Sequence, residues 1–230
     1  MLCFAYSKPE ENTIAFNSQN TRWKHKLIPK NGKVFKWTFK NDTPDLDGMN
    51  LEKRLVNYAL QEYSWRFNIS FEYTTDISLA DIIIEYKNQE SDSFLTSGVL
   101  AYAGFPRTQY QGKIVINDSH LFSKFGEGIN AHEKDPINYP DPNTKTKFLT
   151  YKLVQIFKHE IGHILGLVHN ENDSHSVLYP FYDKKKVMLK KDDIIDLSIK
   201  YGKKPNLNER ILLRKLAYIE YKLLLEQKII

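Results

Sequence analysis

Residues 159–169 read HEIGHILGLVH, a segment in which three histidines, one glutamate and two glycines interrupt an apolar run. Apolar residues at helical spacing lead into this segment from about Phe148, which predicts a helix that begins there and ends within the segment. On such a helix His159 and His163 are four residues apart and lie one turn apart on the same face. Two imidazoles in this arrangement can reach a single zinc ion, about 2.0–2.1 Å from each nitrogen.

The second glycine of the segment suggests how a third histidine joins the first two. If the helix continued, His169 would be rotated by about 600° from His163 and would point away from the ion. Gly166 can instead end the helix, because glycine accepts the positive φ that the position after the helix requires. We therefore expect the chain to turn back at Gly166 and to deliver His169 as the third zinc ligand.

Three neutral ligands leave a zinc ion with its full charge and with an open fourth position for water. Such an ion lowers the pKa of the bound water toward ~7 and polarises a carbonyl group. Glu160 lies too far round the helix to bind the ion, but it can take the proton of that water as general base and pass it to a leaving amine. The segment therefore indicates peptide hydrolysis; the alternative is a helix that carries surface histidines without a metal.

The composition sets limits on the rest of the molecule. The chain has 230 residues, 41% of them hydrophobic, and only one cysteine, Cys3, so one core without internal disulfides is expected. The net charge is +5, but the lysines at 184–186 and 190–191 are not interleaved with aromatic residues, which favours a solvated surface over a nucleic-acid site. No apolar run reaches the roughly 18 residues of a membrane span, and the first residues lack the features of a signal peptide.

The hydrophobic pattern divides the chain into a first half of strands and one helix and a second half of helices. Strands are predicted at 34–41, 69–75, 80–87, 100–105 and 112–118, and helices at 49–68, from about 148, at 189–202 and at 206–230. This order predicts an α/β (or α+β) domain. We expect an N-terminal extended segment over 1–32, a catalytic domain over 33–202 and a C-terminal helical extension over 203–230.

Several motifs in this order resemble one family. HEIGHILGLVH matches the metzincin zinc motif, and the stretches FKNDTPDL (39–46), ADIIIEY (80–86), LAYAGF (100–105), YPFY (179–182) and LKKDDIIDLSIKYG (189–202) follow one another as in a family domain. They resemble the catalytic domain of the matrixins, the matrix metalloproteinase family. The resemblance implies a zincin-like fold with a twisted, mostly parallel sheet. It also implies a zinc endopeptidase that cuts protein substrates, and by the same resemblance an extracellular monomer.

The resemblance also assigns residues to substrate binding. The edge strand at Leu100, Ala101, Tyr102 and Ala103 would hold an extended peptide by β-augmentation. Pro180 and Tyr182 would form the wall of the S1′ pocket, which takes the side chain after the cleaved bond, with residues 183–189 as its loop. For the latter two residues, turn and core packing is the alternative role.

The chain departs from the family at several positions. Leu178 takes the place of the methionine in the turn below the zinc, where leucine of similar volume should serve as the apolar platform. Tyr102 and Val115 stand where two histidines bind a structural zinc, and Ser119 and His120 stand where an acidic pair binds calcium. We therefore expect one catalytic zinc ion and neither structural zinc nor family-type calcium.

Three further interpretations stay open from the sequence. Cys3 lies near the place of the cysteine that keeps matrixins latent, without the flanking residues of that motif, so it is either a zinc latch or an ordinary thiol. Asp192 and Asp193 favour the start of a helix, and by resemblance one of them also ties that helix to the turn below the zinc. The rival functions are a zinc-binding decoy that has lost turnover and a basic nucleic-acid-binding protein.

Overall fold

The computed structural model describes residues 2–6, 32–46, 49–120, 122–123, 151–182, 188–204, 208, 211–212 and 214–219. For residues 2–6 only the backbone is described. Among all these residues, no helix is long and apolar enough to cross a membrane. The loop at 183–187 and most of the predicted C-terminal helix lie outside them, although residues 211–212 and 214–219 are helical as predicted.

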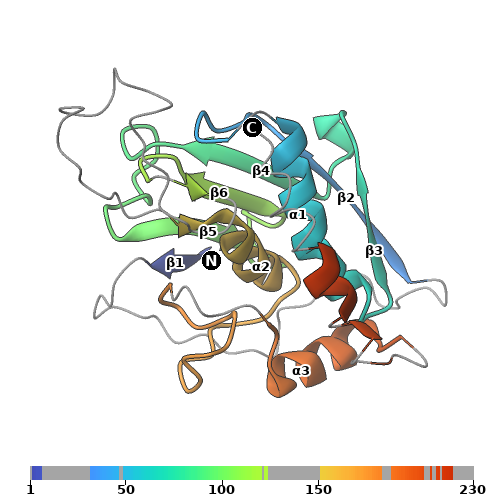
Figure 1. The fold of residues 1–230 in the computed structure, drawn as a ribbon. Coiled ribbons are helices and arrows are strands. Elements are labelled where there is room, and N and C mark those ends of the chain that lie inside the picture. The colour runs from blue at the N-terminus through green and yellow to red at the C-terminus, as the bar shows by residue number, and fades with distance from the viewer. Residues whose placement is uncertain are drawn as a thin grey trace.

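A twisted sheet of six strands, in the order β1-β5-β6-β4-β2-β3, forms one layer of the domain (Figure 1). The strands are β1 (Leu2–Tyr6), β2 (Lys33–Phe39), β3 (Ile69–Tyr73), β4 (Ile82–Lys87), β5 (Val99–Gly104) and β6 (Lys113–Asn117). Three neighbouring pairs are parallel, and β5 runs antiparallel both to β6 and to β1. Five of these strands occur where the sequence predicts them, which confirms the mostly parallel sheet.

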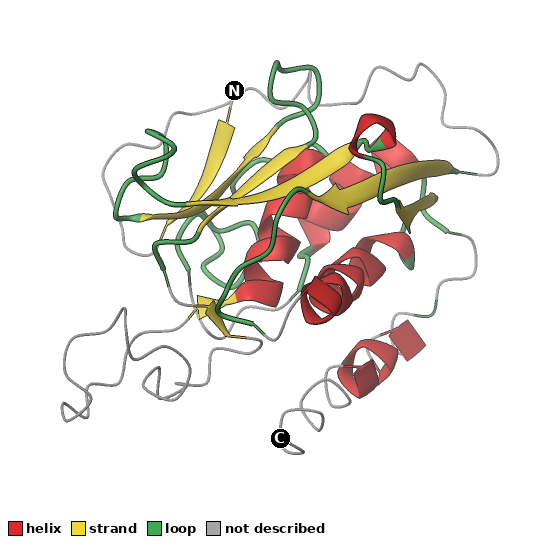
Figure 2. Ribbon diagram, turned by 90° about the horizontal axis from the view of Figure 1, so that it is seen from above, coloured by secondary structure: helices red, strands yellow, loops and turns green. Residues whose placement is uncertain are grey.

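The helices α1 (Met49–Ser64) and α2 (Leu153–Ile164) pack on one face of the sheet, as the view from above shows (Figure 2). Every residue of α2 is buried, because the helix lies between α1 and strand β5. The third helix, α3 (Lys191–Tyr201), ends at Gly202, which has a φ of 76°. This agrees with the predicted helix over 189–202, and the layered arrangement confirms the α/β zincin-like class.

One expectation about element positions was wrong. Helix α2 begins at Leu153 rather than near Phe148, because Tyr151 and Lys152 form a short strand, β8, that pairs with β7 (Phe122–Ser123). Within the predicted extended segment 1–32, residues Leu2–Tyr6 form strand β1 on the edge of the sheet, with Cys3 opposite Ala103; the side chain of Cys3 lies outside the described residues.

A buried network of charged side chains joins helices α1 and α2. The Glu62 carboxylate of α1 lies 3.3 Å from Arg66 Nη1 and 3.0 Å from Lys158 Nζ of α2. It also accepts a hydrogen bond from the Leu189 N–H. All three charged side chains are almost inaccessible to solvent, so removing one charge would leave the others uncompensated.

We expect Glu62→Ala to lower the free energy of unfolding by about 3–5 kcal/mol, because Arg66 and Lys158 would stay buried without a counter-charge. Urea denaturation measures the change. Glu72→Ala, at an exposed position of strand β3, is the matched control and should change the value by less than about 0.5 kcal/mol. A similar loss in both variants would show that the network has no special role.

A second group of acidic side chains lies where the segment after β2 meets the end of β6. Thr43 donates its backbone N–H to Glu52 and its hydroxyl to Asp118, and Asp45 accepts the Phe122 N–H. Burial raises the pKa of all three carboxyl groups, and for Asp45 the pKa rises to about 6, with the Asp118 charge adding to the effect. These acids are therefore protonated more readily in the folded than in the unfolded chain.

The sign of the resulting pH dependence can be stated for Asp45. Its folded-state pKa of about 6 lies above the ordinary 3.8, so between these values the folded chain holds the proton and stability falls as pH rises. Asp45→Asn, which keeps an oxygen for the Phe122 N–H, should flatten that decline in denaturation series from pH 4 to 7. Asp76→Asn is the control. Hydrogen bonds from Ser78 lower the pKa of Asp76, so the contribution of Asp76 to stability changes with pH in the opposite direction to that of Asp45. An unchanged slope in Asp45→Asn would contradict this assignment.

Candidate metal centre

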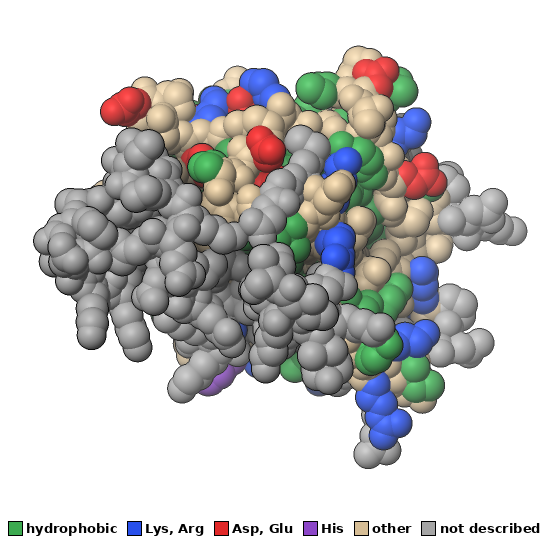
Figure 3. Space-filling view, turned by 45° about the horizontal axis from the view of Figure 1, so that its top comes forward, with side chains coloured by type: hydrophobic (Ala, Val, Ile, Leu, Met, Phe, Trp, Pro, Cys, Tyr) green, Lys and Arg blue, Asp and Glu red, His purple; other side chains and the backbone are tan. Residues whose placement is uncertain are grey.

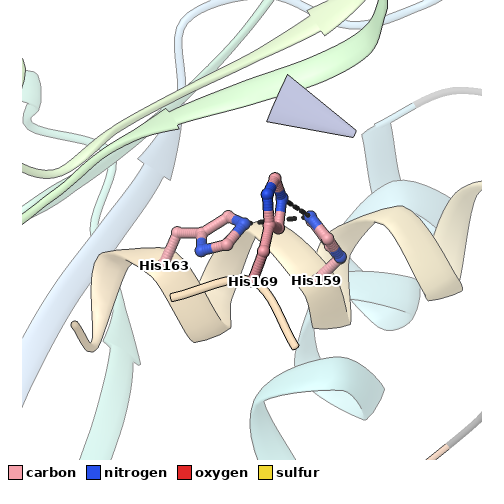
Figure 4. A group of neighbouring side chains, drawn as sticks. All are labelled: His159, His163 and His169. Atoms are coloured by element: carbon pink, nitrogen blue, oxygen red, sulfur yellow. Dashed lines mark hydrogen bonds between the residues drawn. The ribbon is translucent and has the colours of Figure 1, made fainter. Parts of the chain in front are cut away.

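Three histidine rings converge at the end of helix α2. His159 and His163 project from successive turns of α2, and His169 reaches them from the segment that follows the helix (Figure 4). The Nε2 atom of His159 lies 2.9 Å from Nε2 of His163 and 3.3 Å from Nε2 of His169. Within the described part of the chain, these three residues are the one group of three potential ligands close enough to share an ion.

The backbone reverses at Gly166 as the sequence predicts. Gly166 has a φ of 92°, its N–H donates to the His163 carbonyl, and the Leu167 N–H donates to the Gly162 carbonyl. These two hydrogen bonds make a Schellman motif, the common helix ending with a glycine in the left-handed region. Helix α2 therefore ends at Ile164, directly after His163, and the returning chain places His169 beside the other two rings.

Backbone carbonyl groups orient the two helical imidazoles. The Nδ1 atom of His159 lies 2.7 Å from the Val177 carbonyl oxygen, and Nδ1 of His163 lies 2.8 Å from the Leu167 carbonyl oxygen. A carbonyl can only accept, so each Nδ1 must carry a proton, and in the neutral form of each ring Nε2 then presents a lone pair. Burial and the two neighbouring rings also lower the pKa of His163 well below its usual value, which keeps its imidazole neutral.

Lone pairs that face each other at these distances repel unless a cation lies among them. Two ligand nitrogens that each lie about 2.0–2.1 Å from a tetrahedral ion are about 3.3–3.4 Å apart. The Nε2–Nε2 distance between His159 and His169 agrees with this value, and the distance between His159 and His163 is a few tenths of an ångström shorter. Neutral imidazoles with carbonyl partners on the second nitrogen are the usual ligand form. The donor set therefore fits a zinc ion.

Glu160 is the acid next to this group. It is fully buried, both carboxylate oxygens lack a hydrogen-bond partner among the described residues, and burial raises its pKa well above the usual range. A buried carboxyl group without partners is costly unless it serves a polar group held by the site. Its position in the sequence beside His159, and its chemistry, fit a proton acceptor next to the ligands.

Leu178, which we expected to stand in place of the methionine in the turn, packs against helix α2 at Gly162. It is completely buried, and a Cβ built on Gly162 would lie 3.0 Å from its Cδ1 and 3.2 Å from the Tyr63 hydroxyl. The absence of a side chain at Gly162 thus lets both groups approach the helix between the two ligands. Tyr63 completes the contact by donating a hydrogen bond to the Lys158 carbonyl.

The turn that contains Leu178 is tied to helix α3. Ser176 donates its hydroxyl to Asp193 and accepts the Leu178 N–H, and Asp193 also accepts the Lys190 N–H at the start of α3. Asp193, rather than Asp192, is therefore the acid that joins the last helix to the turn. Because Val177 in the same turn accepts from His159, these contacts position a ligand as well as the turn.

We expect Leu178→Met to change the free energy of unfolding by less than about 1.5 kcal/mol, because methionine fills a similar volume. Leu178→Ala should cost about 2–5 kcal/mol through the cavity it leaves, and it should also weaken zinc binding because Val177 would lose its fixed position. Denaturation and competitive zinc titration measure the two effects. Equal zinc affinity in all three proteins would show that the turn does not position His159.

The predicted wall residues lie on the far side of this turn. Pro180 is buried, and Tyr182 is half-buried with its hydroxyl accepting the Lys152 N–H at the start of α2. The Tyr182 ring also packs edge-on against Tyr151, with ring centroids 5.0 Å apart. Tyr182 is thus held at the N-terminal end of α2, while the loop expected to follow it lies mostly outside the described residues.

Strand β5, the second strand of the sheet after β1, packs against α2. Its residues Leu100, Ala101, Tyr102 and Ala103 are all buried, partly because β1 pairs with the outer edge of the strand. The Tyr102 hydroxyl donates to Asp92, which also pairs with Lys87. Neither the pairing with β1 nor this hydrogen bond was predicted from the sequence.

Comparisons with known proteins agree with the geometry. The sequence model of the Matrixin family matches residues 22–202, so the chain belongs to the matrixins, a family of zinc metalloendopeptidases. A protein of Trichoplusia ni ascovirus 2c named as a matrix metalloproteinase is 27% identical over 178 residues, 76% of this chain and 30% of its own length.

Two further relatives come from a bacterium and a vertebrate. Karilysin of Tannerella forsythia is 27% identical over 154 residues, covering 64% of this chain and 28% of its own. Matrix metalloproteinase-18 of Xenopus laevis is 26% identical over 212 residues, covering 89% and 38%. The chain thus spans well under half the length of these three relatives.

Proposed function

We propose that this protein is a zinc-dependent endopeptidase of matrixin type that hydrolyses peptide bonds in protein substrates. His159, His163 and His169 hold the zinc ion and Glu160 acts as general base. The observation that supports this most strongly is the convergence of three Nε2 atoms in the same segment as a buried carboxyl group that has no hydrogen-bond partner among the described residues. When bound, the ion supplies Lewis acidity, which polarises the peptide carbonyl and makes water a better acid.

Residues of the protein itself carry out the remaining steps of the reaction. Glu160 takes the proton from the attacking water and delivers it to the amine that leaves. The burial of Glu160, which raises the pKa of its carboxyl group, supports a role in which the group gains a proton and then releases it. The Val177 and Leu167 carbonyls keep two imidazoles in the tautomer that binds the ion.

Substrate recognition is proposed for the two elements that flank the metal centre. Leu100, Ala101, Tyr102 and Ala103 of β5 would pair with the extended backbone of the substrate. Pro180 and Tyr182 would bound the pocket for an apolar side chain after the cleaved bond. The anchoring of Tyr182 to Lys152 supports a fixed wall at that position.

We further propose that the catalytic ion is the protein's sole zinc ion and that the calcium sites of the family are lost. At the former zinc positions, Tyr102 and Val115 pack with Leu95 and Val99 in a small apolar cluster. At the former calcium positions, the Ser119 hydroxyl accepts the Gln89 N–H and the His120 ring packs against Tyr151. Hydrogen bonds and packing thus replace the ions that would otherwise hold these loops.

The proposed organisation is a catalytic domain over 33–202 with an N-terminal segment over 1–32 and a C-terminal helical extension over 203–230. We propose that the protein acts as a monomer on protein substrates and does not bind nucleic acid. On the face in Figure 3, Lys and Arg side chains are dispersed among acidic and apolar ones and form no single patch. A dispersed charge of this kind gives little attraction to a phosphate backbone.

Glu160→Gln separates the peptidase from the zinc-binding decoy. We expect this variant to bind one zinc ion as the parent does, but to cleave a quenched peptide about 10²–10⁴-fold more slowly, because the amide cannot accept the proton. A metal count and an initial-rate assay, each with and without chelator, provide the two measurements.

Two outcomes of these measurements on Glu160→Gln and the parent protein would contradict the proposal. Cleavage that persists in Glu160→Gln would reject Glu160 as general base. A parent protein that binds zinc but cleaves no peptide from a broad library would favour the decoy.

A further inference from the structure

Helix α3 reaches the turn after helix α2 through two neighbouring side chains of its last turn. Lys200 Nζ lies 2.7 Å from the Gly166 carbonyl oxygen, and the Tyr201 hydroxyl donates to the Leu165 carbonyl oxygen at 2.9 Å. The partners are 34 and 36 positions apart in the chain. The end of one helix thus holds the end of another.

Three consecutive carbonyl groups of this turn are engaged by side chains. Those of Leu165 and Gly166 accept from α3. The carbonyl oxygen of Leu167 lies 2.8 Å from Nδ1 of His163. Carbonyl groups at the end of an α-helix have no intrahelical partner, so their direction depends on the other groups that donate to them. Helix α3 therefore fixes the two residues that precede the acceptor of a proposed zinc ligand.

The direction of the Lys200 side chain indicates a specific role in this contact. The side chain is 8% exposed, although Asp196, its ion-pair partner one turn earlier on α3, is 40% exposed. A lysine usually keeps its charged end in water, because burying the charge is costly unless it is paired. Here the ammonium group turns inward and bonds both to the Asp196 carboxylate and to the Gly166 carbonyl. A cation is also favourable at this end of α2, where the helix dipole is negative.

Tyr201 combines a core contact with its hydrogen bond to the turn. Its side chain is 2% exposed, and its ring packs edge-on against Phe35 of β2, with ring centroids 6.3 Å apart. The hydroxyl at the end of the ring donates to the turn. Removing that hydroxyl should leave the ring packing in place, so a variant can separate the hydrogen bond from the core contact.

Resting on the proposed function, we propose that Lys200 and Tyr201 are positioning residues of the metal centre. They hold the turn so that its next carbonyl group orients His163 and the returning chain brings His169 to the ion (Figure 4). Both act through the backbone and not through contact with the substrate. Removing a group that orients a metal ligand typically weakens metal binding about 10–100-fold.

The two imidazoles that carbonyl groups orient provide an internal comparison. His159 is oriented by the Val177 carbonyl. The turn of Val177 is tied to α3 through Asp193, in the first turn of that helix. Lys200 and Tyr201 should therefore act on one ring and leave the other unchanged. A residue that only stabilises the fold would act on both rings or on neither.

The test uses the full, zinc-loaded chain with two single substitutions. Lys200→Met keeps an unbranched side chain but removes the donor, and Tyr201→Phe removes only the hydroxyl. We expect each variant to release zinc to a chelator about tenfold faster than the parent protein. In NMR spectra of the imidazole groups, the Nδ1–H proton of His163 should exchange with water faster, while that of His159 should not change. Lys200→Arg, which retains a donor, should restore slow zinc release.

Ser198→Ala is the matched control on the same helix. Ser198 donates its hydroxyl to the Ile194 carbonyl within α3, so this variant loses a side-chain hydrogen bond that does not reach the turn. It should release zinc as the parent protein does. Ser176→Ala should give the reverse pattern, because it loosens the other turn: exchange should become faster at His159 and stay unchanged at His163.

Two results would overturn the inference. The first is unchanged zinc release together with an unchanged His163 proton in both Lys200→Met and Tyr201→Phe. The second is equal acceleration of exchange at both rings, because α3 would then only stabilise the fold. Both results are separate from catalysis. A parent protein that binds zinc but cleaves no peptide would contradict the proposed function, while zinc release and ring exchange would still decide the role of the two residues.

Discussion

The mutual orientation of three imidazole rings is the constraint on which the rest of the structure depends. The Nε2 atoms of His159, His163 and His169 converge, and a backbone carbonyl holds Nδ1 of each of the two helical rings, so that the neutral rings direct Nε2 lone pairs toward a shared cation. One carbonyl belongs to the chain that returns after Gly166, and the other to the turn that contains Leu178. The site therefore requires a helix that ends at the right residue and a turn that lies beneath it.

Helix α2 carries three buried polar side chains at this site, and the surrounding protein treats each of them differently. Lys158, His159 and Glu160 are consecutive and all nearly inaccessible to solvent. Lys158 is neutralised by Glu62 of α1, His159 is oriented by the turn, and Glu160 has no hydrogen-bond partner among the residues that the structure describes. A helix with this much buried polarity would be unstable alone, so the ion network with α1 is part of what allows the reactive groups to lie inside the core.

Local patterns in the sequence predicted most of what a local pattern can determine. The spacing of His159 and His163, the helix end at Gly166 and five strands of the sheet follow from helix geometry, glycine conformation and alternation. The start of α2 was placed five residues too early, because apolar spacing continues through Tyr151 and Lys152 into a short strand. A periodic pattern of apolar residues indicates which face of a helix is buried more reliably than it indicates the residue at which the helix begins.

Features that depend on distant backbone pairing could not be predicted in this way. Strand β1 pairs with residues almost a hundred positions later in the chain, and nothing in LCFAY alone distinguishes a sheet strand from a loop. The acceptors of the two Nδ1 atoms are main-chain oxygens, to which the identities of Val177 and Leu167 give no clue. Gly162 was a signal that could have been used, since a glycine inside a buried helix indicates a close approach, here of Leu178 and Tyr63.

The most direct test of the central claim is X-ray absorption at the zinc edge of the purified, zinc-loaded protein and of His169→Ala. The account predicts one ion per chain with three imidazole nitrogens at about 2.0–2.1 Å in the parent protein and two in the variant. A parent spectrum with sulfur ligands, or an imidazole count that is unchanged in His169→Ala, would contradict the convergence of the three rings on one ion.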